Sequence, residues 1–473
     1  MRTIKWKSEL FFLVLALFAT GVFYIITLRA GHNWGGDFSL YILNARNLVE
    51  GRGYSSWPWI YNIQYPGLSP KLYPPAFPLL LAPVIAIWGV NLTAMKILVI
   101  SQLLTALLAL YILARLYLRP FTSLLLVLIT GFNPYLWHFS NQIKPEFTFI
   151  TLLFLTLYIH GRSKKSRTWG IATGALLYLT YATRSIGLIL AVALIIEGII
   201  RRPRRWFYLF TAMVVLTLGI VLENAYIPDL SSYHGMFYFS IPRVIANIQG
   251  YVSVLAYTMD NGYLGSLMTI AAIIVYALSL VGFIKRISKG PDALDIFVII
   301  YVCAVAIWPY FQARYMVPLI PFVLFYALYL IDDLPFLKKN HLAYVLAGLV
   351  LTIYAVKYTA VDYSPLKEGI TKAESTELFN FVRKNIPHDA VVTFAKPRVL
   401  SLMTRRKSLA VQFPVPDSTI MGILKKQGVS FVILSKWSPD DIKYLVPFIF
   451  HHKDRFRLVY SNGDFKVLRL IRQ

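Results

Sequence analysis

Residues 92–116 read LTAMKILVISQLLTALLALYILARL, with one basic residue near each end and no other charge. A helix of this length is long enough to cross the roughly 30 Å of hydrocarbon in a bilayer. Similar apolar windows recur along most of the 473 residues, and the predicted spans cover 9–28, 92–116, 121–139, 146–160, 168–182, 186–200, 206–222, 263–284, 295–310, 313–331 and 342–360. The sequence therefore predicts a polytopic α-helical membrane protein with about eleven transmembrane helices.

The composition excludes the soluble classes of protein. Hydrophobic residues make up 57% of the chain, charged residues make up 15%, and the mean hydropathy is +0.60. Soluble domains average about 45–50% apolar and about 25% charged residues. Because the apolar residues come in long unbroken runs, we exclude a soluble enzyme, a nucleic-acid-binding module and a disordered protein. The single cysteine, Cys303, excludes a disulfide framework.

The distribution of charge predicts the topology. The chain has 47 Lys and Arg residues against 22 Asp and Glu, a net charge of +25. With the N-terminus in the cytoplasm, the short inner segments hold about twice as many basic residues as the outer loops, as the positive-inside rule requires. The proline-containing run 77–90 is placed along the outer interface, because counting it as a span would turn the basic clusters at 162–167 and 201–205 outward.

Two long outer loops follow from this topology, at 29–91 and 223–262. The second is rich in aromatic residues, and we interpret it as a lid over the site in preference to an interfacial segment. The expected location is the cell membrane, plasma or inner, where membrane lipids surround the spans.

The tail, 361–473, differs from the rest of the chain because its apolar runs are short and separated by charges. Strand-like runs at 390–394, 409–411 and 429–434 alternate with helical segments at 373–384, 417–427 and 439–448, and a hairpin is expected over 456–470. An odd number of spans after a cytoplasmic start places this tail outside. The sequence thus predicts a transmembrane domain over 1–360 and an extracytoplasmic soluble α/β domain over 361–473.

Ionisable residues gather at the outer ends of the predicted spans. Asp37 follows the first span and Glu146 begins the fourth. A carboxylate gains nothing from lipid phosphates, so these two acids favour a function. Cations stand in the same outer segments, and a single one is usually a snorkelling anchor. A set that converges from several outer segments is more typical of a site; its cations are Lys71, Lys144, Arg184 and Arg314.

The motifs around these residues resemble those of GT-C glycosyltransferases. They are Gly36-Asp37-x-x-x-Tyr41-x-x-x-Ala45-x-x-Leu48-x-x-Gly51-x-Gly53-Tyr54, Tyr73-Pro-Pro-x-x-Pro78, Lys144-Pro-Glu146, Thr183-Arg-Ser-Ile-Gly187 and Arg314-Tyr-Met-Val-Pro-Leu-Ile-Pro321. The similar enzymes include dolichyl-phosphate-mannose protein mannosyltransferases and bacterial aminoarabinose transferases of lipid A. The resemblance spans nearly the whole chain. It implies transfer of a sugar from a polyprenyl-phosphate donor to a lipid, glycan or protein acceptor at the outer face of the membrane.

The chemistry of such a transfer suggests a role for each residue. Asp37 matches the acid of the motif and is the predicted base that takes the proton of the acceptor hydroxyl. Arg184, Arg314 and Lys71 are predicted to bind the donor phosphate and to stabilise the leaving group. Attack opposite the phosphate would invert the anomeric centre. Glu146 either orients the acceptor or Asp37, or is a helix N-terminal acid. The further candidate substrate contacts are Tyr41, Tyr73, Lys144 and Tyr315.

The first loop departs from the family pattern in one respect. Many relatives have two adjacent acids there, whereas Asp37 is followed by Phe38. Hard cations require several oxygen ligands, and Asp37 with Glu146 offers two carboxylates. We therefore predict chemistry without a metal or other cofactor, with a divalent metal as the alternative.

Two other classes of function compete with an enzyme. They are a transporter or flippase, and a non-catalytic protein that binds a polyprenyl phosphate. The sequence has no inverted repeat and no paired interrupted helices, which argues against the transporter. Asp37 separates the enzyme from both, because a carrier-binding protein needs the cations but not the acid.

Overall fold

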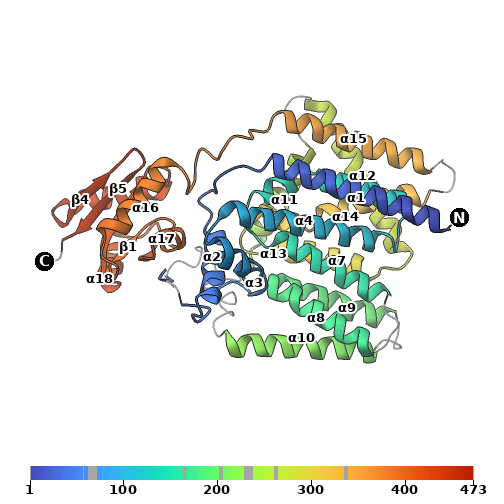
Figure 1. The fold of residues 1–473 in the computed structure, drawn as a ribbon, viewed down its shortest axis with the longest axis horizontal. Helices are drawn as coiled ribbons and strands as arrows, with labels where there is room; N and C mark the ends of the chain where they lie inside the picture. The colour runs from blue at the N-terminus through green and yellow to red at the C-terminus, as the bar shows by residue number, and fades with distance from the viewer. Residues whose placement is uncertain are drawn as a thin grey trace.

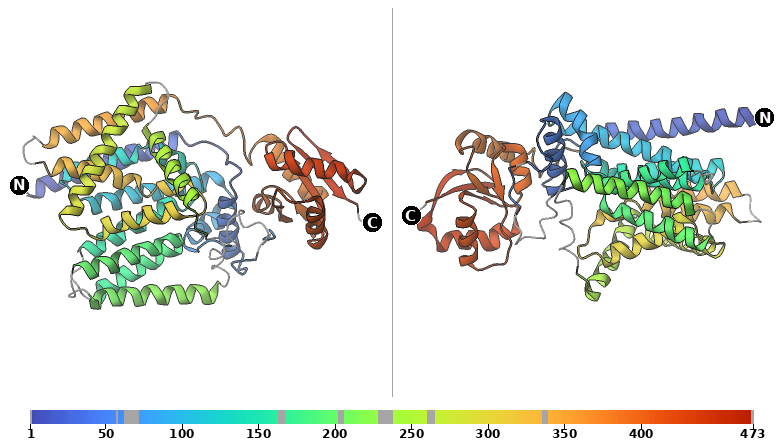
Figure 2. Two further views of the ribbon diagram at one scale, coloured as in Figure 1. Left: turned by 180° about the vertical axis from the view of Figure 1, so that it is seen from behind. Right: turned by 90° about the horizontal axis from the view of Figure 1, so that it is seen from below.

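The structure is a computed structural model that describes residues 2–56, 58–61, 72–162, 167–201, 206–227, 238–259, 265–334 and 339–471. A bundle of helices occupies one end of the molecule and a small sheet with its helices occupies the other (Figure 1). The N-terminus lies at the end of the bundle that is far from the sheet (Figure 2). The main helices of the bundle are α1 (Arg2–Ile26), α4 (Leu92–Ala114), α5 (Pro120–Gly131), α6 (Pro134–Ser140), α7 (Glu146–Arg162), α8 (Arg167–Thr183), α9 (Leu188–Ile200), α10 (Trp206–Tyr226), α11 (Ile241–Met259), α12 (Gly265–Ser288), α13 (Ala293–Ile307), α14 (Ile320–Asp332) and α15 (Lys339–Thr359).

All eleven predicted spans coincide with helices of this bundle. Among the described residues, six helices are long and apolar enough to cross a membrane, and a seventh span results if α5 and α6 count as one. These two helices are bent by 56° at Asn133, whose side chain caps α6 in front of Pro134. The positions of the helices are confirmed, while the count of eleven crossings stays a prediction.

Two helices lie within the predicted outer loop 29–91. α2 (Gly36–Val49) and α3 (Ala76–Trp88) pack against each other at the end of the bundle nearest the sheet (Figure 1). α3 has 13 residues, fewer than the 17 or so that a membrane-spanning helix needs. α9, a predicted span, also has 13 residues, so the interfacial placement of the run 77–90 stays a prediction.

The predicted outer loop 223–262 contains a helix, α11, as the predicted outer loop 29–91 contains α2 and α3. This helix packs against α12 and α13, and the side chain of Asn247 is buried and donates to the carbonyl oxygens of Ala306 and Trp308 at 2.9 and 2.6 Å. Polar residues such as Asn247 interrupt the apolar pattern of this segment, so the sequence predicts no span here. The interpretation of the segment 223–262 as a lid stays a prediction.

Close packing of α8 on α10 holds the segment that leads into the site. A Cβ atom on Gly174 would lie 2.5 Å from the carbonyl oxygen of Ala212, so a larger residue would push the two helices apart. α8 ends at Thr183, and Arg184 follows before the short helix η2 (Ser185–Gly187). The close contact at Gly174 thus helps to set the position of the end of α8, which Arg184 follows.

The C-terminal part contains a five-stranded sheet in the order β2-β1-β3-β5-β4. The strands β1 (Val391–Thr393), β2 (Lys407–Leu409) and β3 (Val429–Ser435) are parallel, and the hairpin of β4 (Phe456–Ser461) and β5 (Phe465–Leu470) adds to β3 in the antiparallel sense. The helices are α16 (Ala373–Asn385), α17 (Pro397–Thr404), α18 (Asp417–Lys426) and α19 (Val446–His451). The predicted strands 390–394 and 429–434, the hairpin and the predicted helices are confirmed, whereas the strand predicted over 409–411 lies earlier, at β2, and shares only Leu409 with it. Sequence analysis missed α17. The domain boundary near residue 360 stays a prediction.

The segment between α1 and α4 attaches the sheet to the bundle. Trp34 stacks on Trp437 with ring centroids 5.0 Å apart and meets the edges of Phe379 and Phe394. The backbone of Ile60 donates to the carbonyl oxygen of Ser408 in β2 at 2.7 Å. α17 packs against α2 (Figure 1). The C-terminal domain is therefore held against the helix that carries Asp37.

Candidate active site

Asp37 lies in the first turn of α2, where two side chains from distant segments reach it. Arg314 Nη1 lies 2.7 Å from Asp37 Oδ2, and the hydroxyl of Tyr73 donates to Asp37 Oδ1 at 2.5 Å. Arg314 comes from η5 (Ala313–Met316), just before α14. Both oxygens of the carboxylate are thereby held in fixed directions, which is the preorganisation that a reacting group requires.

The surroundings of Asp37 keep it ionised. Burial alone would raise the pKa of this carboxyl group, but the charges of Arg314 and Lys144 and the hydrogen bond from Tyr73 hold the pKa well below its usual range. Burial and the Asp37 charge raise the pKa of Tyr73, so Tyr73 stays protonated and keeps donating. The pair is a carboxylate with a fixed neutral donor.

Glu146 forms a second acidic centre beside the first. It stands in the first turn of α7 and is 1% exposed. Its Oε1 lies 3.0 Å from Arg184 Nη1 and 3.9 Å from Arg314 Nη1. A buried charge persists only when it is paired, and the two arginines supply that pairing. Arg314 therefore connects the two acids.

Two buried polar atoms of this group have no hydrogen-bond partner among the described residues. They are Arg314 Nε and Glu146 Oε2. Such atoms are nearly always paired in folded proteins. One donor and one acceptor at this point are therefore available to a bound molecule.

The tyrosines named from the sequence complete the group. Tyr41 lies one helical turn after Asp37 and stacks on Tyr73 at 4.4 Å between ring centroids. The guanidinium groups of Arg184 and Arg314 lie 5.1 and 5.9 Å from the ring centroid of Tyr315. The structure thus brings together seven of the nine predicted site residues, namely Asp37, Tyr41, Tyr73, Glu146, Arg184, Arg314 and Tyr315.

The other two predicted residues have different outcomes. Lys144 is half-buried near the group, with its ammonium 5.6 Å from the ring centroid of Phe139 and its charge acting on Asp37. Lys71 lies outside the residues that the structure describes.

A cavity of about 630 Å³ opens beside the two arginines. Its lining includes Arg184 and Arg314 with Tyr41, Tyr73 and Tyr315. Apolar side chains from α9, α10 and α13 or the residue after it also line the cavity; they include Leu188, Ile189, Ile220, Val305 and Trp308. A molecule that has both an anionic group and an apolar part matches this lining.

Sequence analysis missed two cations of the C-terminal domain. Arg398 in α17 is 2% exposed, and its guanidinium lies 4.5 Å from the ring centroid of Trp59. Lys396 directly precedes α17 and is half-buried. Both lie near enough to Asp37 for their charges to act on its carboxylate. No motif marks them, because their nearness to Asp37 depends on how the C-terminal domain packs.

In the part of the chain that the structure describes, no group of three or more His, Cys, Asp or Glu side chains is placed to hold a metal ion. Asp37 and Glu146 instead form ion pairs with the guanidinium group of Arg314.

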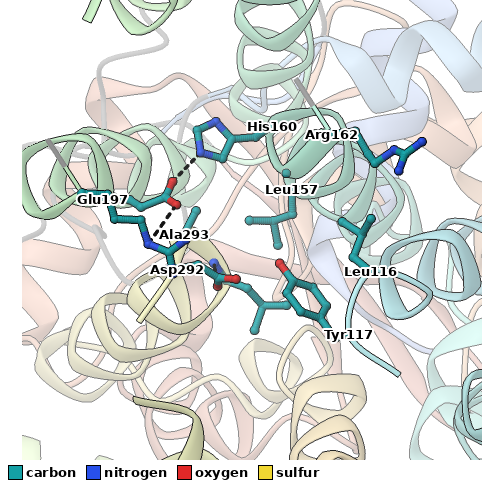
Figure 3. A pocket seen from close by; sticks show the side chains of 11 residues that line it. Leu116, Tyr117, Leu157, His160, Arg162, Glu197, Asp292 and Ala293 are labelled. Carbon is teal, nitrogen blue, oxygen red and sulfur yellow. Dashed lines mark hydrogen bonds and ion pairs between the residues drawn. The ribbon is translucent and has the colours of Figure 1, made fainter. Parts of the chain in front are cut away.

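A second cavity, of about 300 Å³, lies at the other ends of α7, α9 and α13 (Figure 3). His160 contacts Glu197, whose other oxygen is 3.6 Å from Arg201. Asp292 pairs with Arg286 at 2.5 Å. Both acids of this cavity thus have cationic partners within the protein. The first cavity is lined by Arg314, whose Nε is buried without a partner among the described residues, so we take this cavity and the adjoining Asp37 as the candidate active site.

No family model and no curated protein matches the sequence. Among solved structures, ArnT from Cupriavidus metallidurans bound to undecaprenyl phosphate is 13% identical, with 96% of this chain and 97% of that chain covered and a TM-score of 0.62. Archaeal oligosaccharyltransferase AglB from Archaeoglobus fulgidus, in complex with an inhibitory peptide and a dolichol-phosphate, is 12% identical, with 91% and 70% covered and a TM-score of 0.60. Arabinofuranosyltransferase AftD from Mycobacteria is 12% identical, with 98% and 41% covered and a TM-score of 0.61. All three are GT-C glycosyltransferases. The fold of this chain is therefore the GT-C fold, as its motifs indicated.

Proposed function

We propose that the protein is a membrane glycosyltransferase that moves a sugar from a polyprenyl-phosphate donor to an acceptor hydroxyl at the outer face of the membrane. The observation that carries the proposal is the position of Asp37 beside Arg314, which lines a cavity that combines two arginines with apolar side chains. A polyprenyl phosphate likewise combines a charged head with an apolar tail.

The donor phosphate is proposed to bind the two arginines that line the cavity. Arg184 and Arg314 present planar guanidinium groups, which bind phosphate oxygens through paired hydrogen bonds. Arg314 Nε is a buried donor without a partner among the described residues, so it is available to the phosphate. The polyprenyl phosphates bound to ArnT and AglB support a lipid phosphate as the donor carrier.

The reaction proposed for this geometry is a single displacement. The acceptor oxygen attacks the anomeric carbon while Asp37 takes the hydroxyl proton. The bond from the anomeric carbon to the phosphate oxygen breaks, its electron pair stays on the phosphate, and the arginines stabilise the added charge. Attack from the face opposite the phosphate inverts the anomeric centre. Tyr73 orients Asp37, and Glu146 positions the two arginines.

The test of the proposed function is a donor assay. Purified protein in lipid nanodiscs is incubated with a panel of polyprenyl-phosphate sugars and candidate acceptors, and the release of polyprenyl phosphate is measured by mass spectrometry. We expect release from at least one donor, together with a glycosylated acceptor. Binding of donors without any release would favour the non-catalytic carrier-binding protein, and net movement of intact donor across a vesicle would favour the flippase.

The proposed orientation has the N-terminus in the cytoplasm and residues 361–473 outside the cell membrane, on the basis of the Lys and Arg distribution. In a Cys303→Ser background, Ser288→Cys and Ser418→Cys each place one thiol at an exposed position. We expect an impermeant thiol reagent to label Ser418→Cys in intact cells and Ser288→Cys only after permeabilisation. Labelling of Ser288→Cys from outside would overturn the orientation.

A further inference from the structure

The C-terminal domain places Lys396 and Arg398 near Asp37; we refer to these two residues as the tail cations. Arg398 lies in the first turn of α17, which packs against α2, and its side chain stacks on Trp59. Trp59 is in turn bridged to Ser408 of β2. Two separate contacts thus fix the tail cations against the helix that carries Asp37.

The cations around Asp37 differ in whether they have an ion-pair partner. Arg184 and Arg314 form ion pairs with Glu146 and Asp37. Among the described residues, the ammonium groups of Lys396 and Lys144 take part in neither an ion pair nor a hydrogen bond. Burial lowers the pKa of both lysines, because a charged ammonium loses water there. A half-buried cation without a partner is costly, and a bound anion would supply that partner.

Snorkelling does not account for Lys396. It belongs to the sheet domain and precedes a helix whose residues are mostly buried in protein, whereas snorkelling requires a lysine at the end of a membrane helix. Lys396 and Arg398 also do not line the cavity that contains Arg184 and Arg314. The donor phosphate and an anion at the tail cations would therefore occupy different places. The cations at both places interact electrostatically with Asp37.

We propose that the C-terminal domain forms the acceptor side of the active site, and that Lys396 and Arg398 bind an anionic group, a phosphate or a carboxylate, close to the accepting hydroxyl. This proposal rests on the proposed function. The anionic group is not consumed: the acceptor hydroxyl loses its proton to Asp37 and gains the sugar, and the donor leaves as polyprenyl phosphate. The tail cations orient the hydroxyl toward Asp37 and select acceptors by charge.

Lys396 is the residue to vary, because Arg398 also holds Trp59. Lys396→Glu and Lys396→Gln are compared with Lys425→Glu, a matched change at an exposed lysine of α18. Each protein is assayed in nanodiscs with pairs of acceptor saccharides that differ by one phosphate or one carboxylate group. We expect the wild type and Lys425→Glu to prefer the anionic member of a pair. Lys396→Glu should reduce this preference at least tenfold, through a higher KM for the anionic member, and Lys396→Gln should reduce it less.

A binding measurement separates this proposal from the proposed function. ³¹P line broadening of glucose 6-phosphate is recorded with wild-type protein already saturated with a polyprenyl phosphate, and glucose is used as a competitor. We expect broadening that glucose does not reverse and that Lys396→Glu removes. A wild type that causes no broadening, or a Lys396→Glu protein that lowers transfer to both members of a pair equally, overturns the acceptor-side proposal. A wild type that causes broadening but releases polyprenyl phosphate from no donor overturns the proposed function and leaves the anion site in place.

Discussion

Asp37→Asn is expected to lower the turnover of sugar transfer by about a hundredfold or more. Asparagine has the same shape, and its amide oxygen still accepts the hydrogen bond that Tyr73 donates to Asp37. The amide cannot take a proton, so the acceptor hydroxyl must lose its proton without a base. In the proposed function the donor phosphate binds the arginines rather than Asp37, so donor affinity should change much less than turnover.

The measurement is kcat and donor Kd for Asp37→Asn beside Asp389→Asn, which removes an exposed carboxylate of the C-terminal domain. Normal kcat and donor Kd for Asp389→Asn would show that the loss of one carboxylate charge does not by itself lower turnover. Near-normal turnover of Asp37→Asn would mean either that Glu146 is the base or that the protein is not the proposed glycosyltransferase.

The pH dependence provides a second check on Asp37. Its pKa is held below the usual range, so protonation of Asp37 moves to lower pH. Since kcat/KM reports the groups of the free enzyme, it should not fall through protonation of Asp37 as the pH decreases from 7 to about 5. An acid limb above pH 5 that disappears in Asp37→Asn would show that the free enzyme lacks the ion pair with Arg314.

The helices were predictable because the length of an apolar run and the spacing of breakers are local properties. The run 92–116 corresponds to α4, and the hairpin expected over 456–470 corresponds to β4 and β5. α11 was missed for a physical reason: its buried Asn247 donates to two carbonyl groups at the end of α13, and a single sequence contains no sign of that contact. α17 was missed because eight residues are too few for a clear helical period.

The site was predictable as a set of residues but not as a set of pairs. Charges at the outer ends of spans identified Asp37, Glu146, Arg184 and Arg314. The sequence could not indicate that Arg314 lies between the two acids, because 277 residues separate it from Asp37 and only the packing of η5 brings them together. Lys396 and Arg398 are further still along the chain, and their nearness to α2 depends on the docking of a whole domain.

Arg314→Lys is expected to weaken donor binding and slow transfer by about tenfold each, although the charge is retained. The Arg314 guanidinium reaches Asp37 at 2.7 Å and Glu146 at 3.9 Å with one nitrogen and leaves Nε available. An ammonium group is a single point of charge and cannot serve an acid and a phosphate with separate donors. Arg314→Ala should have a larger effect, because it also leaves two acids without their shared cation.

This response differs from that of Asp37→Asn because the donor phosphate is charged both in the bound donor and in the transition state. A bound phosphate would also compete with Asp37 for Arg314, and a carboxylate that loses part of its cation becomes a better base. Donor binding would then prepare Asp37 for the proton of the acceptor, and Arg314→Lys should uncouple the two events. Donor Kd and kcat are measured for Arg314→Lys and Arg314→Ala, with Arg457→Lys at an exposed position of β4 as the control. If both Arg314 variants bind and turn over the donor normally, Arg314 has a structural role in pairing Asp37 with Glu146, and the phosphate binds elsewhere.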